Sequence, residues 1–110
     1  MLAETRIGLE ARNPLANRMR RWNVEIGQDL LGMWLVDVEF GRIGSQGRRL
    51  RRTFFDEPAA RAYVGRALRR RATAPGRIGV AYRCVYSSLQ AQGLVNRAGI
   101  EMVAVGTLIA

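Results

Sequence analysis

The chain has 110 residues, of which 48% are hydrophobic and 25% are charged, the composition of one domain with a modest core. No apolar run approaches the ~18–20 residues that cross a bilayer, and the N-terminal segment lacks the apolar stretch of a secretory signal. We therefore expect a bacterial-type cytoplasmic protein with no membrane partner. One cysteine and no histidine leave almost no material for a disulfide or a transition-metal site, and we expect no cofactor.

The net charge of +9 is concentrated in the middle of the chain. Residues 41–83 hold twelve arginines and two acids, whereas residues 1–40 and 84–110 are close to neutral. All eighteen basic residues are arginine, which genomic base composition can produce by itself. Base composition does not explain the clustering, however, and concentrated positive charge favours a polyanionic partner.

The N-terminal part of the chain predicts an arm followed by two strands. Residues 1–17 show no steady hydrophobic period and include Asn13-Pro14, so we expect an N-terminal arm without regular structure. From Arg20 to Ile26 apolar and polar residues alternate, which predicts a half-buried strand. A hairpin loop over 27–32 leads to a second alternating strand over 34–40.

A third strand and a helix follow. A turn at Ser45-Gln46-Gly47 leads into a strand from Arg48 to Phe55. Asp56 is a good N-cap for a helix, which the charged run Arg69–Arg71 closes and Pro75-Gly76 prevents from continuing. The apolar stripe of this helix has the spacing of a buried face. It comprises Ala60, Tyr63, Val64, Ala67 and Leu68.

The remaining chain predicts a fourth strand over Arg77–Tyr86, a weak helix over Ser88–Asn96 and a last strand over Ile100–Thr107. That last stretch is apolar on both faces, which indicates burial in the core or against a partner. We therefore predict an α+β fold, in which a small twisted antiparallel sheet of four or five strands carries one main helix.

The most unusual stretch is Phe40–Arg52, FGRIGSQGRRLRR, in which three evenly spaced glycines precede four clustered arginines. It is not a Walker A loop, because no Gly-Lys-Ser/Thr follows, and a strand follows where a dinucleotide fingerprint needs a helix. The simplest interpretation is a tight turn that needs positive φ angles, although the amides of such turns also bind anions. GRIG recurs as Gly76–Gly79 with unrelated flanks, which we interpret as coincidence.

Catalysis is poorly supported, and we expect the protein not to be an enzyme. Without histidine or lysine a nucleophile lacks its usual bases. Asp37 and Glu39 share one strand face and form a conceivable carboxylate pair, but solvated strand-face charges are far commoner. Cys84 alternates with apolar residues and is interpreted as a small core residue.

The arginines differ in how easily structure accounts for them. Those at Arg69–Arg71 lie at a predicted helix C-terminus, where the helix dipole favours positive charge. Those of the strand at 48–52 have no acid within three residues of the cluster, so we expect a polyanion to compensate them. Nothing in the pattern identifies bases to be read, which favours backbone or shape recognition over sequence readout.

The segment from about Arg18 to Tyr82 resembles a WGR domain. The resemblance rests on Trp22, Trp34 and the run from Phe40 to Gly47, followed by an Asp-Glu-x-Ala helix start at Asp56. It implies a hairpin with a Trp-Gly-Arg signature whose strands precede a helix, as in poly(ADP-ribose) polymerases and stand-alone bacterial proteins. This chain departs from the signature at Phe40, which offers an aromatic platform without the indole N–H.

The resemblance implies DNA binding, with Phe40 stacking on a base or sugar and Arg42 contacting a phosphate or a partner. We accordingly expect an N-terminal arm (1–17), a WGR-like domain (18–83) and a C-terminal extension (84–110). The leading hypothesis is a non-enzymatic nucleic-acid-binding module, for DNA more than RNA. The alternative is a protein-interaction or assembly module, with a homo-oligomer formed through residues 98–110. The predicted nucleic-acid-binding residues are Phe40, Gly41, Arg42, Arg48, Arg49, Arg51, Arg52 and Arg77.

Overall fold

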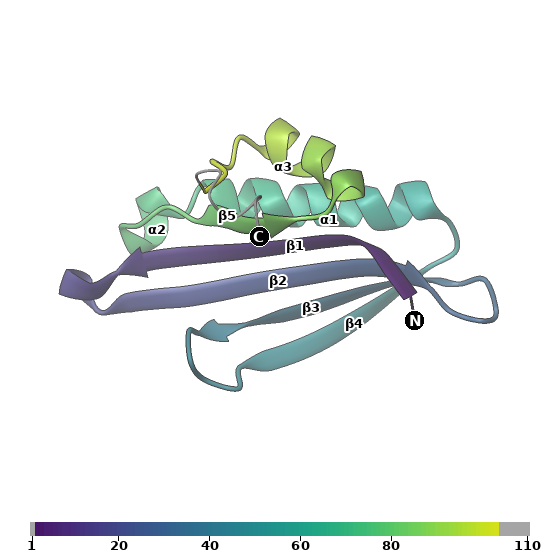
Figure 1. Cartoon of the computed structure of the whole chain (residues 1–110), viewed down its shortest axis with the longest axis horizontal. Coiled ribbons are helices and arrows are strands. Elements are labelled where there is room, and N and C mark those ends of the chain that lie inside the picture. Colours follow the sequence, from purple (N-terminus) through teal and green to yellow (C-terminus); the bar gives the residue numbers. More distant parts are fainter. Residues whose placement is uncertain (1, 104–110) are drawn as a thin grey trace.

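The computed structural model describes residues 2–103 as a five-stranded antiparallel sheet in the order β4-β3-β2-β1-β5, with helices on one face (Figure 1). The predicted α+β class is confirmed. The strands are β1 (Leu2–Asn13), β2 (Arg18–Gln28), β3 (Trp34–Arg42), β4 (Arg48–Phe54) and β5 (Arg83–Ser87). The helices are α1 (Glu57–Ala72), α2 (Pro75–Ile78) and α3 (Gln92–Ala98), with short 3₁₀ turns η1 (Pro14–Ala16) and η2 (Leu89–Ala91).

The hydrophobic core lies between the sheet and α1. Alternate residues of β2 are buried, with Trp22, Val24 and Ile26 each at most 2% exposed, as the period-2 pattern predicts. The facing stripe of α1 supplies Val64 and Leu68, which are fully buried. The core therefore forms where strands and helices, whose sequence periods differ, bring their apolar sides together.

The expectation of an irregular arm over residues 1–17 was wrong. Residues 2–13 form β1, which pairs with β2 along its whole length and with β5 on its other side. Ile7 and Leu9 lie in the core that also contains Ile100, so this segment shares one core with the rest of the chain. The segment does alternate, since Ala3, Thr5, Ile7, Leu9 and Ala11 are all buried, but three of these five side chains are small, so the apolar contrast along the sequence is weak.

The start of α1 is as predicted. Asp56 has an extended backbone, and its Oδ1 accepts a hydrogen bond from the Ala59 amide at 2.8 Å, which satisfies one of the free amides of the first turn. The arginines Arg69–Arg71 lie in the last turn, where the free carbonyls attract positive charge. Thr73 caps the helix by donating its amide to carbonyls of that turn.

The fourth strand is shorter than predicted. β5 begins only at Arg83, whereas the first two residues of the predicted strand, Arg77 and Ile78, belong to the single helical turn α2. Pro75 stands at the start of that turn, where its missing amide costs nothing, and Gly79 closes it at φ +76°. The second GRIG copy is therefore a helical turn and the first a hairpin turn, which supports coincidence.

The C-terminal prediction is confirmed in part. The weak helix over Ser88–Asn96 corresponds to η2 and α3, which end at Ala98. Of the strand predicted over Ile100–Thr107, the described part makes one parallel bridge between Met102 and Cys84, while the residues after 103 lie outside the described part. The homo-oligomer expected through 98–110 stays a prediction.

The placement of β1 can be tested with two leucines from residues 1–17, the segment predicted to be an irregular arm. Leu9→Ala is expected to lower the free energy of unfolding by about 2–5 kcal/mol, because it empties a fully buried position. Leu15→Ala in η1, where the side chain is fully exposed, should change it by less than about 0.5 kcal/mol. Urea denaturation measures both, and equal small effects would contradict the central position of β1.

Candidate functional site

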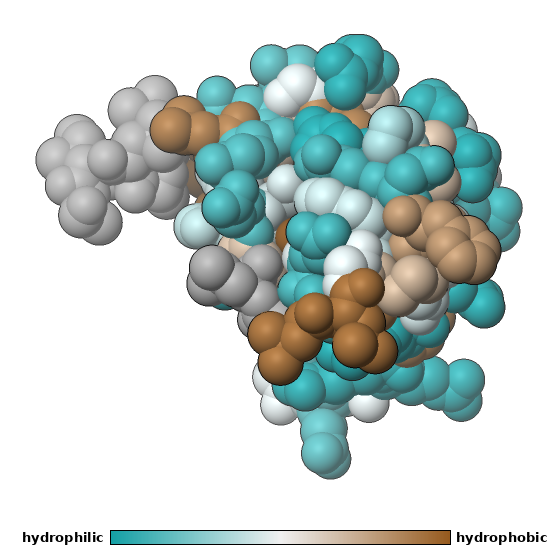
Figure 2. All heavy atoms as spheres, turned by 90° about the vertical axis from the view of Figure 1, so that its right-hand side faces the viewer, coloured by the Kyte–Doolittle hydropathy of each residue, from teal (hydrophilic) through white to brown (hydrophobic). Residues whose placement is uncertain are grey.

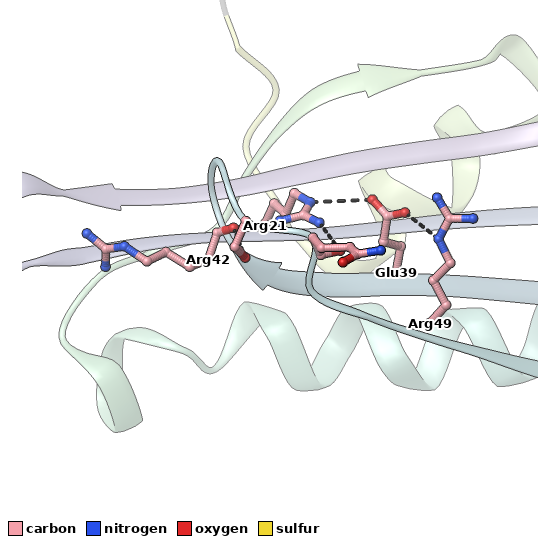
Figure 3. Close-up of polar contacts among 6 residues, drawn as sticks. Arg21, Glu39, Arg42 and Arg49 are labelled. Carbon is pink, nitrogen blue, oxygen red and sulfur yellow. Dashed lines mark hydrogen bonds and ion pairs between the residues drawn. The ribbon is translucent and has the colours of Figure 1, made fainter.

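The glycine-rich turn between β3 and β4 encloses an arginine of the protein itself. The Arg21 guanidinium donates Nη1 to the Arg42 carbonyl at 2.6 Å and Nη2 to the Gln46 carbonyl at 2.9 Å. Its Nε lies 3.4 Å from the Glu39 carboxylate (Figure 3). The turn therefore directs carbonyl oxygens at a cation, which is the opposite of what a phosphate-binding loop presents.

Two positions of the turn require glycine, both because of their φ angles and because neighbouring atoms leave no room for a Cβ. Gly47 has φ +69°, and a Cβ there would lie 2.5 Å from the Phe40 carbonyl oxygen and 2.9 Å from Arg21 Nη2. A Cβ on Gly41 would lie 2.8 Å from the Cα of Gly47. The turn interpretation of the glycine spacing is thus supported, and Gly41, a predicted binding residue, has an internal steric role.

The arginines of β4 divide between the two faces of the sheet. Arg49 and Arg51 lie on the face away from α1, where Arg49 Nε is 2.9 Å from Glu39 Oε2 and Arg51 Nε is 2.6 Å from Asp37 Oδ1. The inference that no acid compensates this cluster was wrong for these two, because β3 brings carboxylates directly opposite them. Glu39 lies between Arg49 and Arg21, in one short network (Figure 3).

The carboxylates of β3 thus act as counter-ions. The Arg51 guanidinium bonds both oxygens of Asp37, and this hydrogen bonding lowers the pKa of the Asp37 carboxyl below its ordinary value. The pair is part-exposed, so its contribution to stability is modest, about 0.2–1 kcal/mol. This accounts for Asp37 and Glu39 without a catalytic role.

On the helix-side face, six further arginines line one groove, to which Arg21 also contributes. It lies where α1 ends, between the start of β2, the end of β3 and the α2 region, and has a volume of about 570 Å³. Arg20 and Arg42 are directly opposite each other on β2 and β3. Both lie on the same side of the sheet as Trp22. We call this the basic groove. It is lined by Asn17, Arg18, Met19, Arg20, Arg21, Trp22, Phe40, Gly41, Arg42, Arg70, Arg71, Arg77, Ile78 and Tyr82.

The basic groove contains seven arginines and no carboxylate among its lining residues. Among the described residues, ion pairs reach only Arg21 of these seven. Two of the others are oriented by neutral acceptors: Arg42 Nη2 donates to Asn17 Oδ1 at 2.7 Å and Arg77 Nη2 to the Arg70 carbonyl at 2.9 Å. Neutral acceptors fix direction without cancelling charge, so the groove keeps its positive potential.

The inner end of the groove is aromatic. The Arg71 guanidinium stacks over the Trp22 ring at 5.0 Å, and burial lowers the pKa of Arg71. Phe40 pairs with Trp22 across the strands and is half-buried, packed against the core. Trp22 itself is almost fully buried, so among this pair only Phe40 offers an edge to the groove.

The predicted binding residues are therefore separated by the fold. Phe40, Gly41, Arg42 and Arg77 line the basic groove, whereas Arg49 and Arg51 lie on the opposite face. Arg48 and Arg52 alternate with them and share the helix-side face, with Arg48 opposite Phe40. Sequence reasoning missed five of the seven groove arginines. Two of the five, Arg18 and Arg20, had a partial signal, because they continue the Trp22 parity of β2. The five are Arg18, Arg20, Arg21, Arg70 and Arg71.

Other candidate chemistry does not assemble. Cys84 is buried as expected, and burial raises the pKa of its thiol. Within residues 2–103, no three potential metal-ligating side chains come together, and no helix combines the length and apolar character needed to cross a bilayer.

Comparison with protein-family models, curated proteins and solved structures found no match to this chain. The resemblance to WGR domains therefore stays a prediction.

The role of the turn predicts an asymmetry between two of its glycines. Gly44→Ala should cost roughly 1–2 kcal/mol, the strain of a left-handed backbone, because φ is +88° but nothing lies near a new Cβ. Gly47→Ala should cost clearly more, since the methyl group also meets the Phe40 carbonyl and Arg21. Chemical denaturation compares the two variants, and equal losses would contradict the packing of Arg21 in the turn.

The Asp37–Arg51 pair predicts a specific pH dependence. Because the folded-state pKa of Asp37 is lowered, the pair stabilises the fold above the unfolded-state pKa and loses that contribution as pH falls through the folded-state pKa. Wild type should therefore exceed Asp37→Asn in stability at about pH 7 by up to ~1 kcal/mol, and the difference should shrink in acid. Denaturation at several pH values measures it, and a pH-independent difference would refute the assignment.

Proposed function

We propose that the protein is a non-enzymatic nucleic-acid-binding module whose binding surface is the basic groove. The observation that carries the proposal is the meeting of seven arginines in one groove, six of which have no carboxylate partner among the described residues. Phosphate groups are the polyanionic ligand to which guanidinium groups are best matched, because the planar fork donates two parallel hydrogen bonds.

The arrangement of arginines in the groove lowers the stability of the isolated protein. Arg20 and Arg42 are directly opposite on neighbouring antiparallel strands, a position in which like charges destabilise a sheet. Both side chains are exposed, and no carboxylate pairs with either of them among the described residues. A phosphate between them replaces repulsion by two attractions, and its counterions are released into solution.

A second hollow extends the surface along α1. It shares Trp22, Phe40, Arg70 and Arg71 with the groove and adds Arg66, so a chain of phosphates leaving the groove meets further guanidinium groups. The half-buried edge of Phe40 lies where the two hollows join and is suited to contact a sugar or an unpaired base. No residue of the groove has a pattern for reading base edges, and the preference for DNA over RNA rests on the WGR resemblance alone.

The proposal predicts that charge removal matters on one face and not on the other. Arg20→Gln/Arg42→Gln should weaken oligonucleotide binding at low salt by about tenfold or more and reduce the salt slope by ~0.7–0.9 for each lost phosphate contact. Fluorescence anisotropy with labelled single-stranded, duplex and nicked DNA at several salt concentrations measures both quantities.

The matched control is Arg49→Gln/Arg51→Gln, which removes the same charge from the opposite face, where carboxylates already compensate it. Its binding should stay close to wild type. An equal effect of the two double variants would show that only net charge matters and would overturn the groove as the site. Absence of binding by wild type at low salt would overturn the function.

A further inference from the structure

The end of the molecule opposite the basic groove exposes large apolar side chains. Leu30 and Leu31 in the β2–β3 loop are 105% and 89% exposed, and Phe55, between β4 and α1, is 89% exposed. Both connections lie at the same end of the sheet, because Trp34 is in register with Gln28 and with Phe54. Figure 2 shows apolar side chains gathered on this end. We call Leu30, Leu31 and Phe55 the apolar tip.

The tip is held in place by hydrogen bonds rather than by packing. Asp29 Oδ1 accepts from the amides of Leu31 and Met33, both at 2.9 Å, and the Gln28 side chain donates to the Gly32 carbonyl at 2.9 Å. The Asp29 amide in turn donates to the Met33 carbonyl. These bonds present the two leucines to solvent on a defined loop, which lowers the entropy cost of docking them.

Carboxylates outnumber arginines around the tip. Residues 2–5, 28–34 and 53–58, which form this end, contain four carboxylates: Glu4, Asp29, Asp56 and Glu57. Two arginines reach this end from outside those ranges, since Arg6 donates to the Ala3 carbonyl and Arg61 to Thr5 Oγ1. The groove end has the reverse composition, with seven arginines and no carboxylate. The two ends lie at opposite poles of a molecule 47 Å long (Figure 1), because β2 starts in the groove and ends at the tip loop.

We propose that the apolar tip of one copy docks in the basic groove of a second copy, so that the protein associates head to tail. The groove has an apolar part suited to leucine side chains, formed by Met19, Phe40 and Ile78. Its arginines then face the carboxylates that surround the tip. Apolar burial supplies the attraction, and opposite charges fix the orientation.

Charge opposes the symmetric alternatives. A tip-to-tip dimer places four carboxylates against four, and a groove-to-groove dimer places two sets of arginines together. Head-to-tail contacts are heterologous, so each added copy leaves one tip and one groove free. Association is therefore open-ended and grows with concentration.

This inference does not rest on the proposed function, although both use the same groove. A nucleic acid that occupies the groove displaces the tip of the neighbouring copy, so an oligonucleotide that binds should dissociate the assemblies. Self-association without nucleic-acid binding, or the reverse, separates the two proposals.

The test is sedimentation velocity on the full chain over a wide range of concentration. At low salt the mass should rise above the 12.3 kDa of one copy, and added salt should lower it, because the contact includes ion pairs. The tip variant Leu30→Ser/Leu31→Ser and the groove variant Arg20→Gln/Arg42→Gln should each remain monomeric. Circular dichroism confirms that both stay folded, as expected for exposed positions.

Mixing the two variants is the decisive step. The tip variant keeps an intact groove and the groove variant an intact tip, so the mixture should form a 1:1 dimer and grow no further. Leu89→Ser, which removes an exposed leucine outside the tip, and Arg49→Gln/Arg51→Gln should associate as wild type does. A wild type that stays monomeric, a groove variant that still self-associates, or a mixture without dimer would each overturn the proposal.

Discussion

The sixteen-residue helix α1 is shorter than the longest strands of the sheet, so it leaves one end of the helix-side face uncovered. The basic groove lies at that end. α1 is roughly 24 Å long, whereas the eleven residues of β2 extend over about 36 Å. Its last turn lies over Trp22, where Arg71 stacks on the indole. Beyond that point the helix-side face of β2 has no cover, and its residues change from apolar to arginine.

Arginine has several different structural roles in this fold. Arg21 fills a turn with its guanidinium, Arg49 and Arg51 neutralise carboxylates, and Arg20 and Arg42 stand opposite each other without an acid partner among the described residues. All carry the same charge, so net charge cannot separate them. What separates them is the cross-strand neighbour, because residues directly opposite in an antiparallel pair come within reach of each other.

The two ends of the molecule differ in charge and in exposed apolar surface. The basic groove is built from the start of β2 and the end of α1, and the apolar tip from the end of β2 and the connection into α1. An antiparallel sheet with a helix returning along it makes this arrangement possible, because β2 and α1 each have one end near the groove and the other near the tip. A polyanion and the tip of another copy are then competing ligands of one surface.

The sequence by itself determined the elements with an unbroken period. Alternation predicted β2 and β3, Asp56 with its apolar stripe predicted α1, and the glycines predicted the turn before β4. Local interactions, burial of one face and end capping, decide such elements, so neighbouring residues carry the signal. β1 was missed because the buried side of its alternation includes the small residues Ala3, Thr5 and Ala11, which weaken the apolar signal. β5 was predicted too long because Pro75 starts a helical turn instead of an extended chain.

Only the tertiary structure decided which arginines form a site. Strand pairing placed Asp37 and Glu39 opposite Arg51 and Arg49, and chain reversal brought Arg20 near Arg70, fifty positions later. These relations depend on register and on the path of the helix, which no local pattern encodes. The sequence predicted that positive charge matters here; the fold decided where that charge is left without a carboxylate, because electrostatic compensation acts across space and not along the chain.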